Sequence, residues 1–341
     1  ANLGVARIKR DILRRSSIGA IFTRRSPARG GLDTAETYGV DGSFSFYQNV
    51  AFNTYWARTR TPGVPDNDTS YRGQFTYTGD RYGAQFERLS VGDGFTPQLG
   101  FLRRDNFVKS SALVRFTPRP RKRFRAVRKF GYQALINYFE NGAGHLETRQ
   151  REGEFYMEFQ SSDRIQFNYQ DGYELLTTPF TIARGVTIPA GGYALRTFTA
   201  ELRVGQQRMA SGNWSVETGP FYGGRRTALS YSSARVKFNQ HLAVEPGLSI
   251  DRVTLPYGDF TARLVSSRVT YTVTPLMFVS ALVQYNSSNA TLGSNIRLRW
   301  EYQPGSEIFV VYNEGRNTLL GGRPDLQNRA LIVKVNRLFR F

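Results

Sequence analysis

The sequence predicts an all-β fold, a large antiparallel up-and-down transmembrane β-barrel, and three observations lead to this class. Apolar and polar residues alternate with a period of two along most of the 341 residues, which is the pattern of strands with one apolar face. The connections between the alternating segments are short and long in turn. The chain also ends in an amphipathic segment, Ala330 to Phe341, whose last residue is aromatic.

About nineteen segments show this alternation, which lies within the strand numbers of known single-chain membrane barrels. They recur at intervals of roughly ten to twenty residues, as expected for an all-β sandwich or barrel. We expect the apolar side of each segment to face lipid and the polar side to face a lumen. In chain order, the clearest apolar sides consist of Tyr38, Val40, Phe44 and Phe46; Val50, Phe52 and Trp56; Phe75 and Tyr77; Val108, Ala112, Val114 and Phe116; Phe155, Met157 and Phe159; Ile165, Phe167 and Tyr169; Met277, Val279, Ala281, Val283 and Tyr285; and Ile296, Leu298, Trp300 and Tyr302.

The connections decide between a barrel and a sandwich. Outer-membrane barrels have short periplasmic turns and long extracellular loops, whereas a soluble sandwich has no reason to keep such an asymmetry. We expect inward-folded loops, such as residues 176–191, to gate or plug the lumen. The short connections include residues 48–49, 79–80, 161–163, 240–241, 274–275 and 304–306, and the long ones include residues 26–36, 61–68, 92–105, 176–191 and 316–327.

The last segment predicts how the barrel is assembled and oriented. Its apolar side carries Leu331, Val333, Val335, Phe339 and Phe341. An unpaired strand of this kind would invite aggregation, so it must close the barrel. We expect Phe339 and Phe341 to be the assembly signal that the barrel-assembly machinery reads. Phe341 then lies in the periplasm, on the side of the short turns.

The strand number predicts that the wall is larger than this chain. An odd number of strands places Ala1 on the long-loop side, whereas bacterial single-chain barrels nearly always have an even number. We therefore expect no ladder between Val5–Ile12 and Leu331–Phe341. An upstream segment or another chain would complete the wall, and residues 1–341 would form a single transmembrane β-barrel domain that lacks upstream strands.

The composition fits this fold and excludes some chemistry. The chain is 40% hydrophobic with a mean hydropathy of −0.43, and no run approaches the roughly 18–20 apolar residues of a membrane helix. The absence of cysteine excludes disulfides and thiolate sites. Lys and Arg number 46 against 27 Asp and Glu, a net charge of +19, which suggests polyanionic partners such as lipopolysaccharide or nucleic acid.

Arginines gather at the expected outer ends of strands, where guanidinium groups could bind phosphates of lipopolysaccharide. The alternative is a solvated loop surface. A second basic cluster, Arg119 to Lys129, falls at a periplasmic turn and has no nucleic-acid-binding module around it, so an interfacial anchor or a docking surface is favoured over nucleic acid. The outer arginines are Arg24, Arg25, Arg58, Arg60, Arg103, Arg104, Arg149, Arg151, Arg225, Arg226, Arg316, Arg323 and Arg329; those singled out for lipopolysaccharide contact are Arg24, Arg25, Arg58, Arg60, Arg225 and Arg226.

Charged residues of both signs fall on the expected lumen side. Rings of charge tune the selectivity of a pore, and an excess of cations would give a mild preference for anions. The alternative is a set of cross-strand ion pairs that only make the interior polar. The cations are Arg72, Lys109, Arg115, Arg235, Lys237, Arg268, Arg297, Arg299 and Lys334, and the acidic residues are Asp41, Glu154, Glu158, Glu201, Glu245, Asp251 and Glu301.

Signals for catalysis are poor, and no cofactor or metal site is expected. The two histidines, His145 and His241, fall in an outer loop and an inner turn, on opposite sides of the membrane. A pair of His145 with Glu147 would lack a placed nucleophile. The glycine pairs 191–192 and 321–322 lack the strand–helix setting of phosphate loops, so turns explain them.

Several segments resemble a family of Gram-negative outer-membrane proteins that carry an N-terminal carbohydrate-binding-module-like domain of the family 9 type before a long C-terminal region. The resemblance implies an outer-membrane barrel and a sugar-related association without an established reaction. It also implies a β-sandwich domain and further strands upstream, which this chain lacks. The segments are Val5 to Arg25, Pro179 to Tyr193, Leu255 to Phe260, Ile308 to Leu319 and the terminal strand.

These observations favour a non-enzymatic component of the bacterial outer membrane that acts as a pore, a translocation component or a scaffold, with a polar, net-basic lumen. The alternative is a membrane-anchored surface protein that binds or handles glycans. A soluble, basic nucleic-acid binder is supported by the charge alone.

Overall fold

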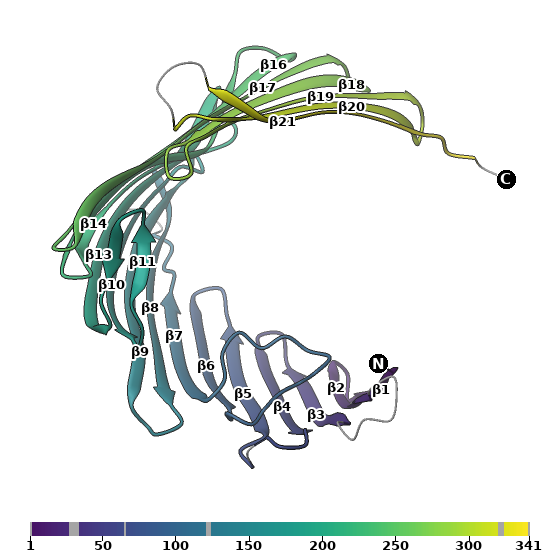
Figure 1. Cartoon of the computed structure of the whole chain (residues 1–341), viewed down its shortest axis with the longest axis vertical. Coiled ribbons are helices and arrows are strands. Elements are labelled where there is room, and N and C mark those ends of the chain that lie inside the picture. The colour runs from purple at the N-terminus through teal and green to yellow at the C-terminus, as the bar shows by residue number, and fades with distance from the viewer. Residues whose placement is uncertain (1, 27–33, 65, 121–123, 320–323, 340–341) are drawn as a thin grey trace.

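The computed structural model describes residues 2–26, 34–64, 66–120, 124–319 and 324–339. The described residues form one antiparallel sheet of 19 strands, in which each strand pairs with its neighbours along the chain, and one two-stranded hairpin (Figure 1). The strands are β1 (Asn2–Ile12), β2 (Ser16–Ser26), β3 (Ala35–Phe46), β4 (Val50–Arg60), β5 (Thr69–Thr78), β6 (Tyr82–Val91), β7 (Phe107–Phe116), β8 (Val127–Asn141), β9 (Leu146–Phe159), β10 (Arg164–Leu176), β11 (Phe180–Ala183), β12 (Val186–Ile188), β13 (Gly191–Val204), β14 (Ala210–Phe221), β15 (Gly224–Lys237), β16 (Leu242–Leu255), β17 (Gly258–Thr274), β18 (Met277–Asn286), β19 (Thr291–Gln303), β20 (Ser306–Asn317) and β21 (Asp325–Asn336).

The predicted up-and-down architecture and strand number are confirmed by this sheet. No helix among the described residues is long and apolar enough to cross a membrane. The connections 13–15, 47–49, 79–81 and 304–305 share one end of the strands, here called the short-turn end. The connections 61–68, 92–106 and 177–190 share the other, the long-loop end. The asymmetry is incomplete, because the turns 222–223 and 256–257 at the long-loop end are short and residues 117–126 at the short-turn end are long.

The two faces of the sheet differ in polarity, because the registers continue from strand to strand and align side chains in rows. One row on the apolar face consists of Val114, Ala134, Gly153, Tyr169 and Phe198. One row on the polar face consists of Ser43, Asn53, Gln74, Glu87 and Ser111. By the same alternation, Arg297 and Arg299 lie on the face opposite Leu298 and Trp300.

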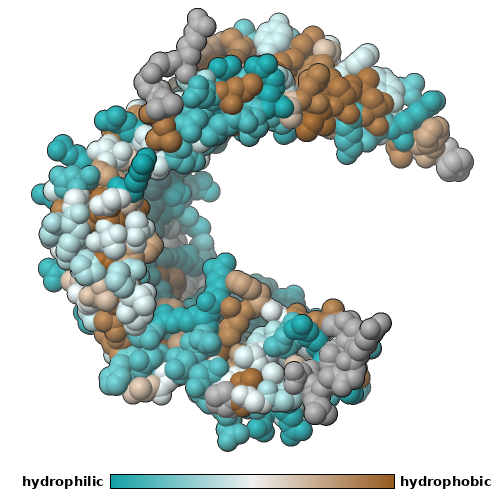
Figure 2. Space-filling view, in the orientation of Figure 1, coloured by the Kyte–Doolittle hydropathy of each residue, from teal (hydrophilic) through white to brown (hydrophobic). Residues whose placement is uncertain are grey.

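Exposure identifies which face is convex. Val40 and Phe86 on the apolar face remain 55% and 48% exposed, whereas the Glu87 and Glu154 side chains on the polar face are only 6% and 14% exposed. Side chains spread apart on the outside of a curved sheet and converge on the inside. The apolar face is therefore the outer face and the polar face the inner one. In Figure 2, hydrophilic residues border the hollow of the curve, and apolar residues form a patch over β18 to β20.

The sheet is open. The described residues pair β1 with β2 alone and β21 with β20 alone, and they form no ladder between β1 and β21. The two edge strands lie on opposite sides of the opening in Figure 1. This is the arrangement that the odd strand number predicts, and it leaves one row of backbone N–H and C=O groups unpaired along each edge strand.

Two long loops fold onto the inner face at the long-loop end. The hairpin of β11 and β12 packs Val186 and the fully buried Ile188 against Tyr222, Val253 and Leu255. The loop 92–106 places its Phe95 beside Val91 and Phe107 in a second cluster. The expected inward folding of residues 176–191 is confirmed in this form, although the hairpin itself was not predicted. It covers the wall and does not cross the hollow of the sheet (Figure 1).

Candidate functional site

The inner face between β5 and β7 is built from ion pairs. Glu87 accepts a hydrogen bond from Arg72 Nε at 2.6 Å and another from Lys109 Nζ at 2.7 Å. Its side chain is only 6% exposed, and a buried carboxylate is tolerated only when it is paired in this way. One carboxylate thus holds two cations from neighbouring strands in place.

The same pattern continues across β9, β10 and β13. Glu154 lies 3.0 Å from Arg164 Nη2 and also accepts from Gln166 Nε2 at 3.0 Å. Glu201 lies 2.6 Å from Arg203 Nε. In this half of the sheet, therefore, the cross-strand ion pairs that the sequence left as an alternative do occur.

Most of the predicted lumen cations on the inner face from β15 to β21 are less tightly paired. Arg235 Nε lies 3.8 Å from Glu245, and Arg299 pairs with Glu307 and, at 3.9 Å, with Glu301. No acidic partner within 4.0 Å is found among the described residues for the remaining four cations of this half. These are Lys237, Arg268, Arg297 and Lys334.

A groove of about 680 Å³ that contains several serines lies on the inner face between β15 and β18. Small side chains, among them Ser230, Ser249 and Ser266, form its floor, and Arg235 and Arg268 stand at its side.

Arg115, the remaining predicted lumen cation, lies at the short-turn end of β7 and donates from Nη2 to the Gly79 carbonyl oxygen at 2.8 Å. All nine predicted lumen cations thus fall on the inner face.

Four of the six arginines predicted to contact lipopolysaccharide lie on the outer face at the long-loop end. Arg24 Nε lies 3.8 Å from Glu36, and Arg58 Nε lies 2.8 Å from Asp68. The Arg60 guanidinium lies over the Tyr38 ring at 5.7 Å. Arg225 Nη2 donates to Thr218 at 3.3 Å.

The other two, Arg25 and Arg226, lie on the inner face, which does not fit the predicted contact with lipopolysaccharide. Arg25 Nη1 donates to Gln98 at 2.5 Å. Arg226 bridges Glu217 and Asp251, each at 2.7 Å. The physical reason is that adjacent residues of a strand point to opposite faces, so Arg24–Arg25 and Arg225–Arg226 cannot both be lipid-facing pairs.

A charged cluster lies on the outer face in the long-loop half of β9, β10 and β13, and sequence reasoning named only its members Arg149 and Arg151. Asp171 lies 3.3 Å from Arg196 Nε and 3.7 Å from Arg149 Nη2, and it is the register partner of Arg151. The signal was available, because Asp171 interrupts the apolar side that carries Phe167 and Tyr169.

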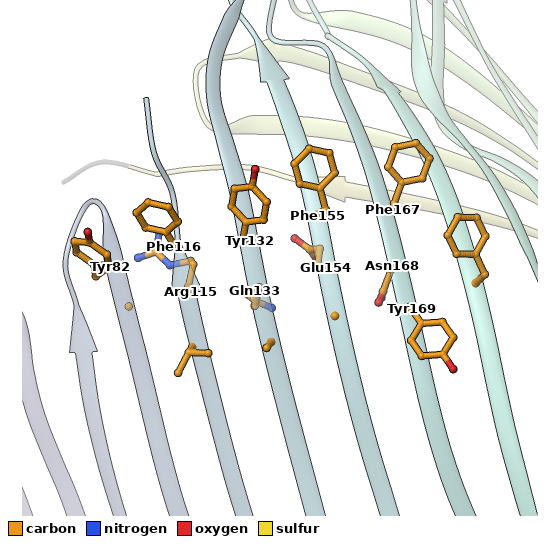
Figure 3. Close-up of a pocket in the computed structure, with 15 residues that line it drawn as sticks. Tyr82, Arg115, Phe116, Tyr132, Gln133, Glu154, Phe155, Phe167, Asn168 and Tyr169 are labelled. Atoms are coloured by element: carbon orange, nitrogen blue, oxygen red, sulfur yellow. The ribbon is translucent and has the colours of Figure 1, made fainter. Parts of the chain in front are cut away.

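Aromatic rings form a row on the outer face near the short-turn end. The ring centroids are 5.2 Å apart for Tyr82 and Phe116, 6.2 Å for Phe116 and Tyr132, and 5.1 Å for Tyr132 and Phe155. Figure 3 shows these rings side by side across neighbouring strands, followed by Phe167. These rings are register partners on neighbouring strands and therefore form one continuous aromatic surface.

One pair of charges joins two turns at the short-turn end. Asp163 accepts hydrogen bonds from Arg208 Nη2 at 2.5 Å and from the Gly205 N–H at 2.9 Å. The Arg208 hydrogen bonds, followed by the Gly205 N–H, hold the pKa of the Asp163 carboxyl well below its usual range. The connections 160–163 and 205–209 are therefore fixed to each other.

The remaining sequence predictions are placed as follows. His145 and His241 lie at opposite ends of the strands, and the described residues contain no cluster of ligands that could hold a metal. Phe339 follows β21 and is 62% exposed, with the Arg337 guanidinium 5.0 Å from its ring centroid. Phe341 lies outside the described residues.

Comparison with known proteins adds two similar structures. No protein-family model matches the chain, and no curated protein matches it. The ferric-catecholate import receptor Fiu from E. coli K12, in its open form, aligns with a TM-score of 0.40 and 10% identity, over 97% of this chain and 71% of the receptor chain. A mutant of the ferric enterobactin receptor PfeA from Pseudomonas aeruginosa aligns with a TM-score of 0.39 and 8% identity, over 93% and 71%.

Proposed function

We propose that this chain is part of the wall of a bacterial outer-membrane β-barrel and serves as a pore, a translocation component or a scaffold. The observation that carries the proposal is the difference between the faces of the 19-stranded sheet. The outer face exposes apolar side chains from β2 to β21, and the inner face holds the ion pairs. Lipid is the solvent that suits the first face, and water suits the second.

The free-energy cost of exposing apolar side chains to water favours a membrane barrel over a soluble protein. Soluble monomers rarely expose a contiguous apolar patch larger than a few hundred Å², whereas Val40, Phe86 and Trp300 belong to a surface that extends across the whole sheet. Placing the inner face against lipid would also be costly, because an arginine at the bilayer midplane costs roughly 2–4 kcal/mol. The inner face carries Arg72, Arg164 and many similar groups.

The lumen side supports a mild preference for anions. The inner-face cations of β5 to β13 are held by carboxylates, except for Arg115, which donates to a backbone carbonyl oxygen. Arg268, Arg297 and Lys334 are the groups that a permeating anion would meet. The hairpin of β11 and β12 and the loop 92–106 narrow the inner space at the long-loop end. The outer arginines of the same end, Arg24, Arg58, Arg60 and Arg225, stand where lipopolysaccharide phosphates would lie.

Completion of the wall is the second part of the proposal. Each unsatisfied backbone group in hydrocarbon costs several kcal/mol, so the free edges of β1 and β21 need partner strands. Another chain or a further segment of the same protein would supply them. Phe339 and Phe341 then act as the assembly signal for the barrel-assembly machinery.

A second candidate function is the handling of glycans, with the chain as the barrel region of the family that carries a carbohydrate-binding-module-like domain. One observation favours it besides the resemblance. The groove between β15 and β18 combines serine hydroxyls with Arg235, Glu245 and Arg268, and such a surface offers many hydrogen bonds to a polyhydroxylated solute. Weak binding of neutral oligosaccharides that depends on Arg268 would support this candidate.

Two measurements test the main proposal. Migration of the protein in detergent gels with and without heating tests whether it is a folded barrel; identical migration of both samples would contradict it. Single-channel recordings then test the lumen. We expect open channels with a preference for anions that decreases in a variant carrying Arg268→Glu and Arg297→Glu. A folded protein that shows no conductance would refute the pore hypothesis and would be consistent with the scaffold role alone.

A further inference from the structure

The charged cluster of Arg149, Arg151, Asp171 and Arg196 stands directly above an apolar groove on the outer face. Arg151, Asp171 and Arg196 form one row across β9, β10 and β13. The next row toward the short-turn end is Gly153, Tyr169 and Phe198, again register partners on the same three strands. The cluster and the groove are therefore adjacent parts of one surface.

The groove exists because small residues interrupt the aromatic surface. Ala134 and Gly153 form its floor, and Phe116, Phe155 and Phe198 are among the rings around it, in a space of about 670 Å³. A Cβ placed on Gly153 would meet no heavy atom within 4 Å. Figure 3 shows the rings of Phe116, Tyr132, Phe155 and Phe167 that border this region.

The cluster carries an excess of positive charge. Three arginines surround the single carboxylate of Asp171. The Nε atom of Arg149 is buried without a hydrogen-bond partner among the described residues, and the Arg196 side chain is 61% exposed. A ligand with several anionic oxygens would satisfy the exposed donors of the cluster, and guanidinium groups suit phosphate because they bind it bidentately.

We propose that this surface is a discrete binding site for one lipopolysaccharide molecule, with a phosphate of its lipid A held by Arg149, Arg151 and Arg196 and one acyl chain lying in the groove over Ala134 and Gly153. The arginine cluster lies nearer the long-loop end than the groove does. This order matches the ligand, because the phosphate lies at the headgroup level and the acyl chain points toward the membrane centre. The inference rests on the proposed function, which places the long-loop end in the outer leaflet.

The test compares lipid binding by matched variants of the full chain, purified in detergent and titrated with rough lipopolysaccharide under native mass spectrometry. We expect R151Q/R196Q to lower the affinity at least tenfold. The control R14Q/R15Q removes the same charge from exposed positions of the turn 13–15 at the short-turn end and should bind as the unmodified protein does. R151K/R196K keeps the charges and should retain most of the binding.

A second variant tests the groove without changing charge. Gly153→Ile fills the open space beside Ala134, and we expect it to lower the affinity for lipopolysaccharide several-fold. Equal binding by R151Q/R196Q and R14Q/R15Q, or unchanged binding by Gly153→Ile, would overturn the site. Equal affinity for phosphatidylglycerol, or displacement of the lipid by millimolar inorganic phosphate, would overturn the commitment to a lipopolysaccharide molecule held by both of its parts.

Heat-dependent migration of every variant separates this inference from the proposed function. A heat-modifiable protein that fails the lipid test refutes the site alone. A chain that shows no heat-modifiable form refutes the barrel itself, and with it the orientation on which the site depends.

Discussion

Replacing Val269 with arginine tests which face of the sheet meets lipid. Val269 lies on the outer face of β17, where its register partners are Val244 and Ala281, and it is 39% exposed. The next residue, Thr270, points to the inner face, where its partners are Ala243 and Ser280. The two positions lie at nearly the same depth, so Thr270→Arg is a matched control for Val269→Arg.

The expected magnitude follows from the transfer of a guanidinium group into hydrocarbon. An arginine on the lipid face of a barrel costs about 2–4 kcal/mol near the midplane, which is roughly a 30- to 900-fold change in the folding equilibrium at about 1.36 kcal/mol per factor of ten. Thr270→Arg should cost well under about 1 kcal/mol, since the new charge remains in water.

The assay is reversible unfolding in urea from lipid vesicles, followed by fluorescence of the 3 tryptophans. We expect a lower urea midpoint for Val269→Arg than for Thr270→Arg at an unchanged slope. Equal midpoints for the two variants, or a greater loss for Thr270→Arg, would refute the assignment of the faces.

Three further predictions concern an ion pair of the inner face, the turns at the short-turn end and the β11–β12 hairpin. Glu87→Gln leaves Arg72 and Lys109 without their shared carboxylate and should lower the unfolding free energy by about 1–3 kcal/mol, measured by the urea midpoint against Gln85→Glu as a control; an unchanged midpoint would contradict the pairing. Because its folded pKa is lowered, Asp163 contributes stability above its unfolded pKa of about 3.9, and this contribution is lost as the pH falls through the folded pKa. The excess stability of the unmodified protein over Asp163→Asn should therefore decrease below about pH 4, and a constant difference across thermal scans would refute it. Ile188→Ala should loosen the β11–β12 hairpin at a local cost of about 2–5 kcal/mol and increase protease cleavage within residues 177–190; unchanged cleavage would show that the hairpin is not held by this contact.

The fold class could be predicted from the sequence because the period-2 alternation is a local property. The segments around Phe75, Val114 and Leu298 each carry it without reference to the rest of the chain, and the ladders confirm them. The position of seven of the nine lumen cations on the inner face follows from the same parity. Arg235 and Lys237 are the exceptions, because a register shift between Tyr231 and Val236 changes which side chains of β15 point inward.

The parts that could not be predicted depend on contacts between distant segments. Residues 176–191 show loop composition, and only the packing of Ile188 against Val253 and Leu255 selects a hairpin on the inner face. Arginines at strand ends were grouped by closeness in sequence, which ignored the alternation that sends Arg226 inward to Asp251. The ion-pair partners of Glu87 also come from different strands, and their choice needs the register.

The absence of cysteine from the chain allows the most direct test of the central claim, that one face of this sheet meets lipid and the other meets water. Single cysteines at the six consecutive positions 296–301 of β19 would be spin-labelled in lipid vesicles, and their collision rates with oxygen and with a water-soluble nickel complex measured. We predict high oxygen accessibility at Ile296, Leu298 and Trp300 and high nickel accessibility at positions 297, 299 and 301. Uniform accessibility along β19, or the opposite alternation, would contradict the account.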